Sequence, residues 1–168
     1  MTHRLVLLRH AKVEHGLDVP DAQRPLSPRG RSQAAQVGTA LVAAGLTPDL
    51  VLCSSSLRAR QTWQLVGARL GAESPVRFLD GLYDAGVDEV LAAVRTADEA
   101  ARVVLVVGHE PAMSRTATAL AGLGSDEATY GRILLGVPTA AWSVSVVTGP
   151  WADVTRGSAR LTRLHVPA

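Results

Sequence analysis

The residues Val103 to Pro111 read VVLVVGHEP, and this stretch decides the fold of the chain. Its first five residues are apolar and mostly β-branched, which is typical of a strand buried on both faces of a parallel sheet. A glycine ends the apolar run, and His109 follows it directly. The pattern therefore predicts a central strand that places His109 at one end of a sheet.

Two further segments have the same form. Arg4 to Leu8 is a short apolar run that ends in Arg9 and His10, and Leu50 to Cys53 is another apolar run, followed shortly by Arg58. In open parallel sheets, ligands bind beyond the carboxyl ends of the strands. We therefore expect these arginines and the strand-end histidines to converge on one edge of the sheet.

Helical patterns separate the apolar runs. Ser27 followed by Pro28 is a typical helix start, with the hydroxyl as N-cap and proline in the first turn. A glycine-rich loop is expected after the last helix. The predicted helices are 28–44, 57–70, 88–94 and 112–121, and the predicted strands are 4–8, 50–53, 76–79, 103–107, 141–148 and 160–165. This alternation predicts an α/β fold, a three-layer α/β/α sandwich with a mostly parallel central sheet.

Composition narrows the class of protein. The chain has 168 residues, 47% hydrophobic and 19% charged, with a net charge of +2. These values favour a single packed domain over residues 1–168 and argue against disordered, collagenous or coiled-coil proteins and nucleic-acid binding. Cys53 is the only cysteine, which predicts no disulfide and fits the cytoplasm. The N-terminal apolar run is too short for a signal peptide or a membrane helix, so no membrane association is expected.

The residues expected at the sheet edge suit a phosphoryl group. Paired guanidinium groups match phosphoryl oxygens bidentately, and helix N-termini add aligned N–H donors. Arg9, Arg58, His10 and His109 would therefore form a phosphate pocket. The other histidines, His3, His15 and His165, lack such a context and are expected to be structural or surface residues.

Four segments together resemble a known family. Leu8–Lys12, Arg24–Gly30, Ser54–Thr62 and Val107–Pro111 resemble, in order and spacing, the histidine phosphatase superfamily, which has the phosphoglycerate-mutase-like fold. The spacing is similar to that of its SixA-type phosphohistidine phosphatase branch. The resemblance implies a phosphatase of this fold.

The resemblance also implies roles for the four residues. His10 would be the nucleophile that takes up the phosphoryl group, and it must be unprotonated to attack. Arg9 and Arg58 would hold the phosphoryl oxygens, and His109 would add a hydrogen bond that strengthens in the transition state. In this design the arginines replace Mg²⁺, so no metal and no cofactor are expected.

The general acid is left open among three carboxylates. Larger members of the family carry an acid on an insertion after the third strand, where this chain has only a short segment with Asp80 and Asp84. Asp21, just before the Arg24–Gly30 segment, is a third candidate. Each has a competing structural role.

Several functions remain open, and the oligomeric state is undetermined. The preferred substrate is phosphohistidine in a protein, and the alternatives are a small phosphoester substrate or a non-catalytic phosphate-binding module. A mutase is disfavoured because residues 78–103 leave little room for a lid.

A cysteine-dependent phosphatase is excluded, since only four residues separate Cys53 from Arg58 where that chemistry needs five. Cys53 is expected to pack as a small apolar residue, and the serines at 54–56 to cap a helix.

Overall fold

The computed structural model describes residues 2–168. It contains one six-stranded sheet with the strand order β3-β2-β4-β1-β5-β6. The strands are β1 (Thr2–Arg9), β2 (Leu50–Ser54), β3 (Val76–Leu79), β4 (Val103–Gly108), β5 (Trp142–Thr148) and β6 (Ala159–His165). Neighbouring strands from β3 through β1 run parallel, whereas β5 and β6 add an antiparallel edge. The predicted mostly parallel sheet is confirmed.

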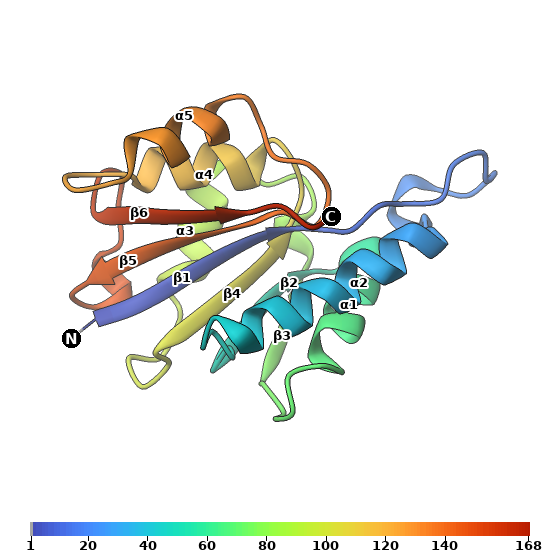
Figure 1. Cartoon of the computed structure of the whole chain (residues 1–168), viewed down its shortest axis with the longest axis horizontal. Helices are drawn as coiled ribbons and strands as arrows, with labels where there is room; N and C mark the ends of the chain where they lie inside the picture. Colours follow the sequence, from blue (N-terminus) through green and yellow to red (C-terminus); the bar gives the residue numbers. More distant parts are fainter. Residues whose placement is uncertain (1) are drawn as a thin grey trace.

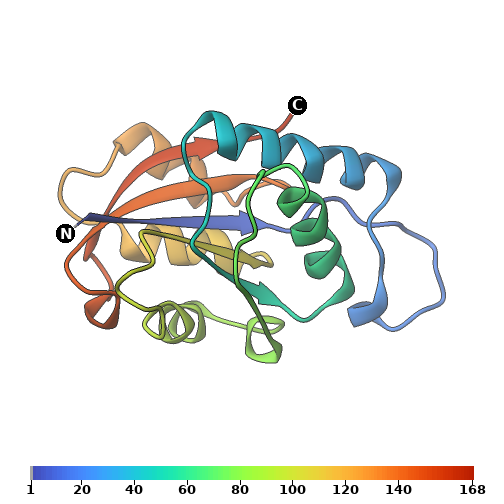
Figure 2. The same ribbon diagram turned by 90° about the horizontal axis from the view of Figure 1, so that it is seen from below.

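Helices cover both faces of the sheet (Figures 1 and 2). One face carries α1 (Pro28–Ala43) and α2 (Leu57–Gly67), and the other carries α3 (Val87–Val94), α4 (Ala112–Leu120) and α5 (Glu127–Leu134). The buried apolar residues accordingly form two clusters, one on each side of the sheet. The predicted three-layer sandwich is therefore confirmed. Over residues 2–168, no helix is both long and apolar enough to span a bilayer.

The central strands are buried because they have apolar side chains on both faces. All residues of β2 and β4 are buried, and so are Leu5 to Leu8 in β1. Cys53 is completely buried in β2, as expected. Since helices pack on both faces, these strands cannot alternate apolar with polar residues, and they read as continuous apolar runs.

Two helices differ from the sequence prediction. The segment expected to be a glycine-rich loop contains α5, whose N-cap is Asp126, with its carboxylate accepting a hydrogen bond from the Thr129 N–H at 2.9 Å. Its apolar pattern is short and is interrupted by Gly131, so the cap and the packing of buried Ile133 against the core decide the structure. In addition, α2 ends at Gly67 instead of reaching residue 70.

The start of α1 fixes the segment that follows β1. Ser27 is the N-cap, and its hydroxyl accepts a hydrogen bond from the Gly30 N–H at 3.0 Å, as the sequence predicted. The Lys12 carbonyl accepts the Ser27 N–H at 3.0 Å. A Cβ atom on Gly30 would lie 1.9 Å from the Lys12 carbonyl oxygen. Only glycine at this position lets the first turn of α1 pack directly on the backbone at Lys12.

This packing predicts a large cost for Gly30→Ala. Alanine normally favours a helix over glycine, but here its methyl group collides with backbone that cannot move away. We expect the substitution to lower the unfolding free energy by about 3 kcal/mol, as overpacking does. Urea denaturation followed by circular dichroism measures the change.

The matched control is Gly131→Ala in α5, where a Cβ would have no neighbour within 4 Å. This change should raise the unfolding free energy by up to about 1 kcal/mol, the intrinsic helix preference of alanine. Equal stabilisation by both substitutions would show that the Gly30 contact does not constrain the fold.

Candidate active site

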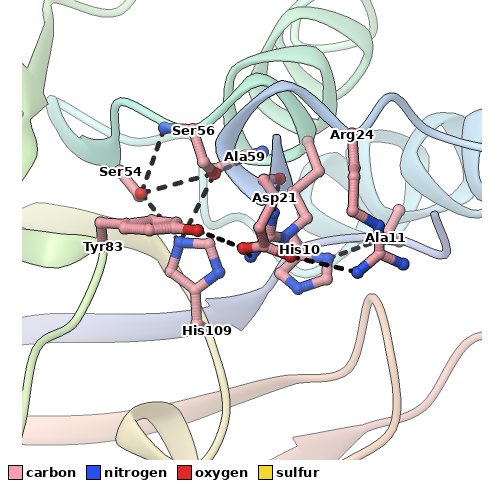
Figure 3. A network of polar contacts seen from close by, with 10 residues as sticks. His10, Ala11, Asp21, Arg24, Ser54, Ser56, Ala59, Tyr83 and His109 are labelled. Carbon is pink, nitrogen blue, oxygen red and sulfur yellow. Dashed lines mark hydrogen bonds and ion pairs between the residues drawn. The ribbon is translucent and has the colours of Figure 1, made fainter. Parts of the chain in front are cut away.

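The ends of β1 and β4 bring two histidines together, as the sequence predicted (Figure 3). Arg9 pairs with Gly108 in the parallel register, and the His10 N–H donates to the Gly108 carbonyl at 2.9 Å. The ring centroids of His10 and His109 lie 5.2 Å apart. The two imidazoles therefore face the same small volume at the carboxyl edge of the sheet.

The His10 ring is held as one neutral tautomer. Its Nδ1 lies 2.8 Å from the Ala11 carbonyl oxygen, which can only accept a hydrogen bond, so Nδ1 carries the proton and Nε2 keeps its lone pair. The Ala11 N–H in turn donates to the Thr62 hydroxyl of α2 at 3.0 Å. Burial lowers the pKa of His10 to about 3. The side chain is therefore an unprotonated base with Nε2 as its free nitrogen.

His109 is also neutral. Burial, with the nearby Arg58 cation as a second cause, lowers the pKa of His109 to about 4. Its Nε2 lies 2.8 Å from the Ser54 hydroxyl, while its buried Nδ1 has no partner among residues 2–168. Of the serines expected to cap α2, Ser56 is the N-cap, whereas Ser54 positions His109. The ring is thus oriented from one nitrogen only.

Arg9 reaches the site from the end of β1. Its Nη1 donates to the Val137 carbonyl at 2.8 Å, and its buried Nε has no partner in the described part of the chain. Burial lowers the pKa of Arg9, and the nearby Glu110 carboxylate opposes that shift. The Glu110 carboxylate also accepts the Val137 N–H at 3.0 Å and the Ser114 N–H at 2.8 Å. Glu110 therefore fixes the loop that holds Arg9.

Arg58, in the first turn of α2, is only 9% exposed. Its Nη1 donates to the Asp21 backbone carbonyl at 2.7 Å, and its Nη2 pairs with the Asp21 carboxylate at 3.0 Å. The guanidinium also lies over the Tyr83 ring, 5.6 Å from its centroid. These contacts hold the cation beside the two histidines.

Asp21 is ionised and tied to three neighbours. The Tyr83 hydroxyl donates to its carboxylate, and Arg24 pairs with it (Figure 3). Arg58 forms a further ion pair with the same carboxylate. The hydrogen bond from Tyr83 is the main cause that lowers the pKa of Asp21 to about 2, with Arg24 and Arg58 adding to it. At neutral pH this group has no proton to give.

The other two acid candidates lie differently. Asp84 is exposed but close enough to His109 for its charge to raise the pKa of that histidine against the effect of burial. Asp80 is exposed at the start of the short 3-10 helix η2 (Asp80–Leu82), and its backbone carbonyl accepts the Tyr83 N–H. No polar contact within residues 2–168 links the Asp80 carboxylate to a strand-end histidine or arginine.

A cavity of about 610 Å³ opens beside these residues. Five of its thirteen lining residues are Lys or Arg and none is Asp or Glu. The lining consists of Arg9, His10, Lys12, Val13, His15, Arg24, Arg29, Gln33, Arg58, Pro138, Thr139, Val166 and Pro167. A cavity with this lining favours an anionic ligand. His15, an exposed surface residue as expected, also lines this cavity.

Sequence reasoning missed the residues that support the site. Tyr83, Ser54 and Glu110 each contact a residue far away in the sequence, such as Ser54 with His109, 55 positions apart. Such contacts leave no periodic signal. The one usable hint was position, because Ser54 is the last residue of β2 and Glu110 lies two residues beyond the end of β4.

Comparison with known proteins agrees with this geometry. A family model described as the histidine phosphatase superfamily (branch 1) matches residues 5–88. An uncharacterized protein of Mycobacterium tuberculosis (strain CDC 1551 / Oshkosh) is 40% identical over 161 residues, covering 95% of this chain and 99% of that protein. The chain belongs to the histidine phosphatase superfamily.

Solved structures place this histidine phosphatase near the SixA branch. A protein from Nakamurella multipartitia assigned as phosphohistidine phosphatase SixA has a TM-score of 0.84 and 34% identity, covering 99% of this chain and 97% of that one. A protein from Agrobacterium tumefaciens with the same assignment has a TM-score of 0.81 and 26% identity, covering 98% of both chains. These similarities support the phosphoglycerate-mutase-like fold and a phosphatase enzyme.

The low pKa of His10 predicts a pH-dependent stability. Between the ordinary histidine pKa of 6.5 and about 3, the unfolded state binds a proton at this position that the folded state does not. The unfolding free energy should therefore fall as the pH is lowered below 6.5, by up to about 1.4 kcal/mol per pH unit for each such histidine. Urea denaturation of the wild type and of His10→Gln from pH 8 to 5 measures the slopes.

The variant should have the shallower slope below pH 6.5, and the two curves should be parallel above pH 7.5, where histidine is neutral in both states. Parallel curves over the whole range would show that His10 titrates normally in the folded protein.

Proposed function

We propose that the chain is a metal-independent phosphatase that forms a covalent phosphohistidine at His10 and acts on phosphohistidine in proteins. One observation carries the proposal. The His10 ring is neutral, its Nδ1 proton is engaged by Ala11, and its Nε2 is free in a cavity lined by Arg9 and Arg58. An unprotonated nitrogen can attack phosphorus, and the two guanidinium groups beside it would hold the phosphoryl oxygens.

The reaction would have two steps. In the first, His10 Nε2 forms a bond to phosphorus while the P–N bond of the substrate phosphohistidine breaks, and the departing imidazole takes a proton from solvent. In the second, water forms a P–O bond, the P–Nε2 bond breaks, and inorganic phosphate leaves. Arg9, Arg58 and His109 would stabilise the negative charge on the phosphoryl oxygens in both steps. The charge neutralisation that Mg²⁺ supplies elsewhere would come from the arginines.

The carboxylates favour a substrate that needs little acid catalysis. Asp21 is ionised, with its pKa lowered to about 2, and Asp84 is exposed beside His109. An alkoxide leaving group requires a positioned acid worth about 10² to 10⁴ in rate, whereas imidazole is protonated readily near neutral pH. The SixA assignments of the similar structures also support a phosphohistidine substrate.

A small phosphoester is the second candidate. It is favoured by the cavity of about 610 Å³, which falls within the size range of sites for small molecules. A non-catalytic phosphate-binding module would use the same pocket, so turnover separates it from both enzymes.

The first functional prediction concerns the covalent step. Rapid-quench labelling with a ³²P-labelled phosphohistidine protein should trap an acid-labile, alkali-stable phosphoenzyme in the wild type. His10→Ala should lose at least about 10³-fold in turnover, as removal of a nucleophile does. Activity should persist in EDTA.

Circular dichroism of His10→Ala checks that the fold is retained. Label on a serine or on Cys53, or chelator-sensitive activity restored by Mg²⁺, would contradict the mechanism. Absence of turnover with every phosphorylated compound would favour the non-catalytic module.

The second functional prediction concerns the leaving group. The kcat/KM should be higher for a phosphohistidine protein than for sugar or glycerate phosphates. Asp84→Asn should reduce phosphoester hydrolysis more than phosphohistidine hydrolysis, because only the ester needs an acid. Asp21→Asn should reduce the hydrolysis of both substrates to a similar extent, because Asp21 is ionised and holds Arg58.

Measuring both substrates with all three proteins gives the comparison. A strong preference for one small phosphoester, together with a large loss on removal of one carboxylate, would assign the enzyme to the metabolite class.

A further inference from the structure

The cavity carries more positive charge than one phosphoryl group requires. Arg9 and Arg58 flank the histidines, and Arg24 pairs with Asp21. Lys12 and Arg29 also line the cavity, and neither forms an ion pair with a carboxylate among residues 2–168. Both side chains are exposed, and two such cations lining one cavity would attract an anion placed between them.

The backbone positions from which these two side chains extend are fixed by hydrogen bonds and packing. The Lys12 carbonyl accepts the Ser27 N–H, and the Lys12 N–H donates to the Gln33 side chain at 3.0 Å. Gly30 packs against the same carbonyl, so Arg29, its neighbour in the first turn of α1, has a fixed origin relative to Lys12. The backbone at this end of the cavity is therefore fixed by the fold.

Lys12 is also only two residues from His10. His10, Lys12 and Arg29 line the same cavity, so a substrate whose phosphoryl group lies at His10 would extend past Lys12 and Arg29. We propose that Lys12 and Arg29 form a subsite for a second anionic group, carried on the leaving-group side of the substrate. This inference rests on the proposed phosphatase function and specifies its substrate class.

Two sources could supply the second anion. One is an Asp or Glu side chain flanking a phosphohistidine in a protein segment. The other is a carboxylate or a second phosphate on a small phosphorylated molecule. The chemistry at the subsite is the same, so substrates of both kinds are needed to separate them.

Binding tests the subsite without turnover. The probes are methylphosphonate and the carboxyalkylphosphonates phosphonoacetate, 3-phosphonopropionate and 4-phosphonobutyrate, whose chain length varies the distance between the two anions. Isothermal titration at low salt should show at least one carboxyalkylphosphonate binding about tenfold more tightly than methylphosphonate to the wild type. The double variant Lys12→Gln, Arg29→Gln should abolish that advantage.

Arg31→Gln is the matched control, because Arg31 is an exposed cation of α1 that does not line the cavity. This variant should still bind that carboxyalkylphosphonate about tenfold more tightly than methylphosphonate. The advantage should shrink in 0.5 M salt, since partly exposed charges are screened. If no phosphonate binds more tightly than methylphosphonate, or if Arg31→Gln and the double variant behave alike, the subsite is refuted.

Turnover identifies the source of the anion. We expect kcat/KM for phosphohistidine peptides with acidic flanks to exceed that for neutral flanks by about tenfold, and the double variant to reduce this ratio toward one. If instead kcat/KM is about tenfold higher only for phosphoesters that carry a carboxylate than for those that lack one, the second anion belongs to a small metabolite. If all substrates are hydrolysed but a second anion raises kcat/KM in neither the peptides nor the phosphoesters, the subsite is refuted and the phosphatase function stands. Tight phosphonate binding without any hydrolysis would refute the phosphatase function and leave the subsite.

Discussion

Parallel pairing of β1 with β4 places Arg9 opposite Gly108, and the rest of the site follows from that register. Because each strand is hydrogen-bonded along its length, the residues just beyond the paired ends cannot slide relative to each other. His10 and His109 therefore leave the sheet side by side, with ring centroids 5.2 Å apart. A shift of one residue would send one of the imidazoles to the opposite face of the sheet.

Burial and positive charge act on the histidines in the same direction. Both lower the pKa values, to about 3 for His10 and about 4 for His109, so each ring stays neutral. The same guanidinium groups, Arg9 and Arg58, would attract a phosphoryl dianion. One arrangement thus keeps a nitrogen lone pair available and creates a field that would attract an anion next to it. The cost is a fold that becomes less stable in acid.

The sequence was informative where a pattern reflects packing on both sides of a strand. The apolar runs predicted β1, β2 and β4, and the residues at or just beyond the ends of β1 and β4 predicted Arg9, His10 and His109 at one edge. The three remaining strands were also predicted, although their sequences mix apolar and polar residues. The sequence was uninformative where a single tertiary contact decides whether a helix forms or which residues meet. The α5 helix depends on the Asp126 cap and on burial of Ile133, and Gly131 weakened its periodic signal. Likewise Tyr83 reaches Asp21 across 62 positions, a contact that no local pattern encodes.

The charges around Arg58 also limit what the site can bind. Three guanidinium groups and the ionised Asp21 carboxylate leave two positive charges, which match a phosphoryl dianion. Since Asp21 occupies two N–H groups of Arg58, the phosphoryl group would be held by the donors that Asp21 leaves free. A proton on Asp21 would weaken this pairing, so a carboxylate that acts as an acid would disturb the phosphate clamp. Asp21 is therefore better suited to positioning Arg58 than to protonating a leaving group.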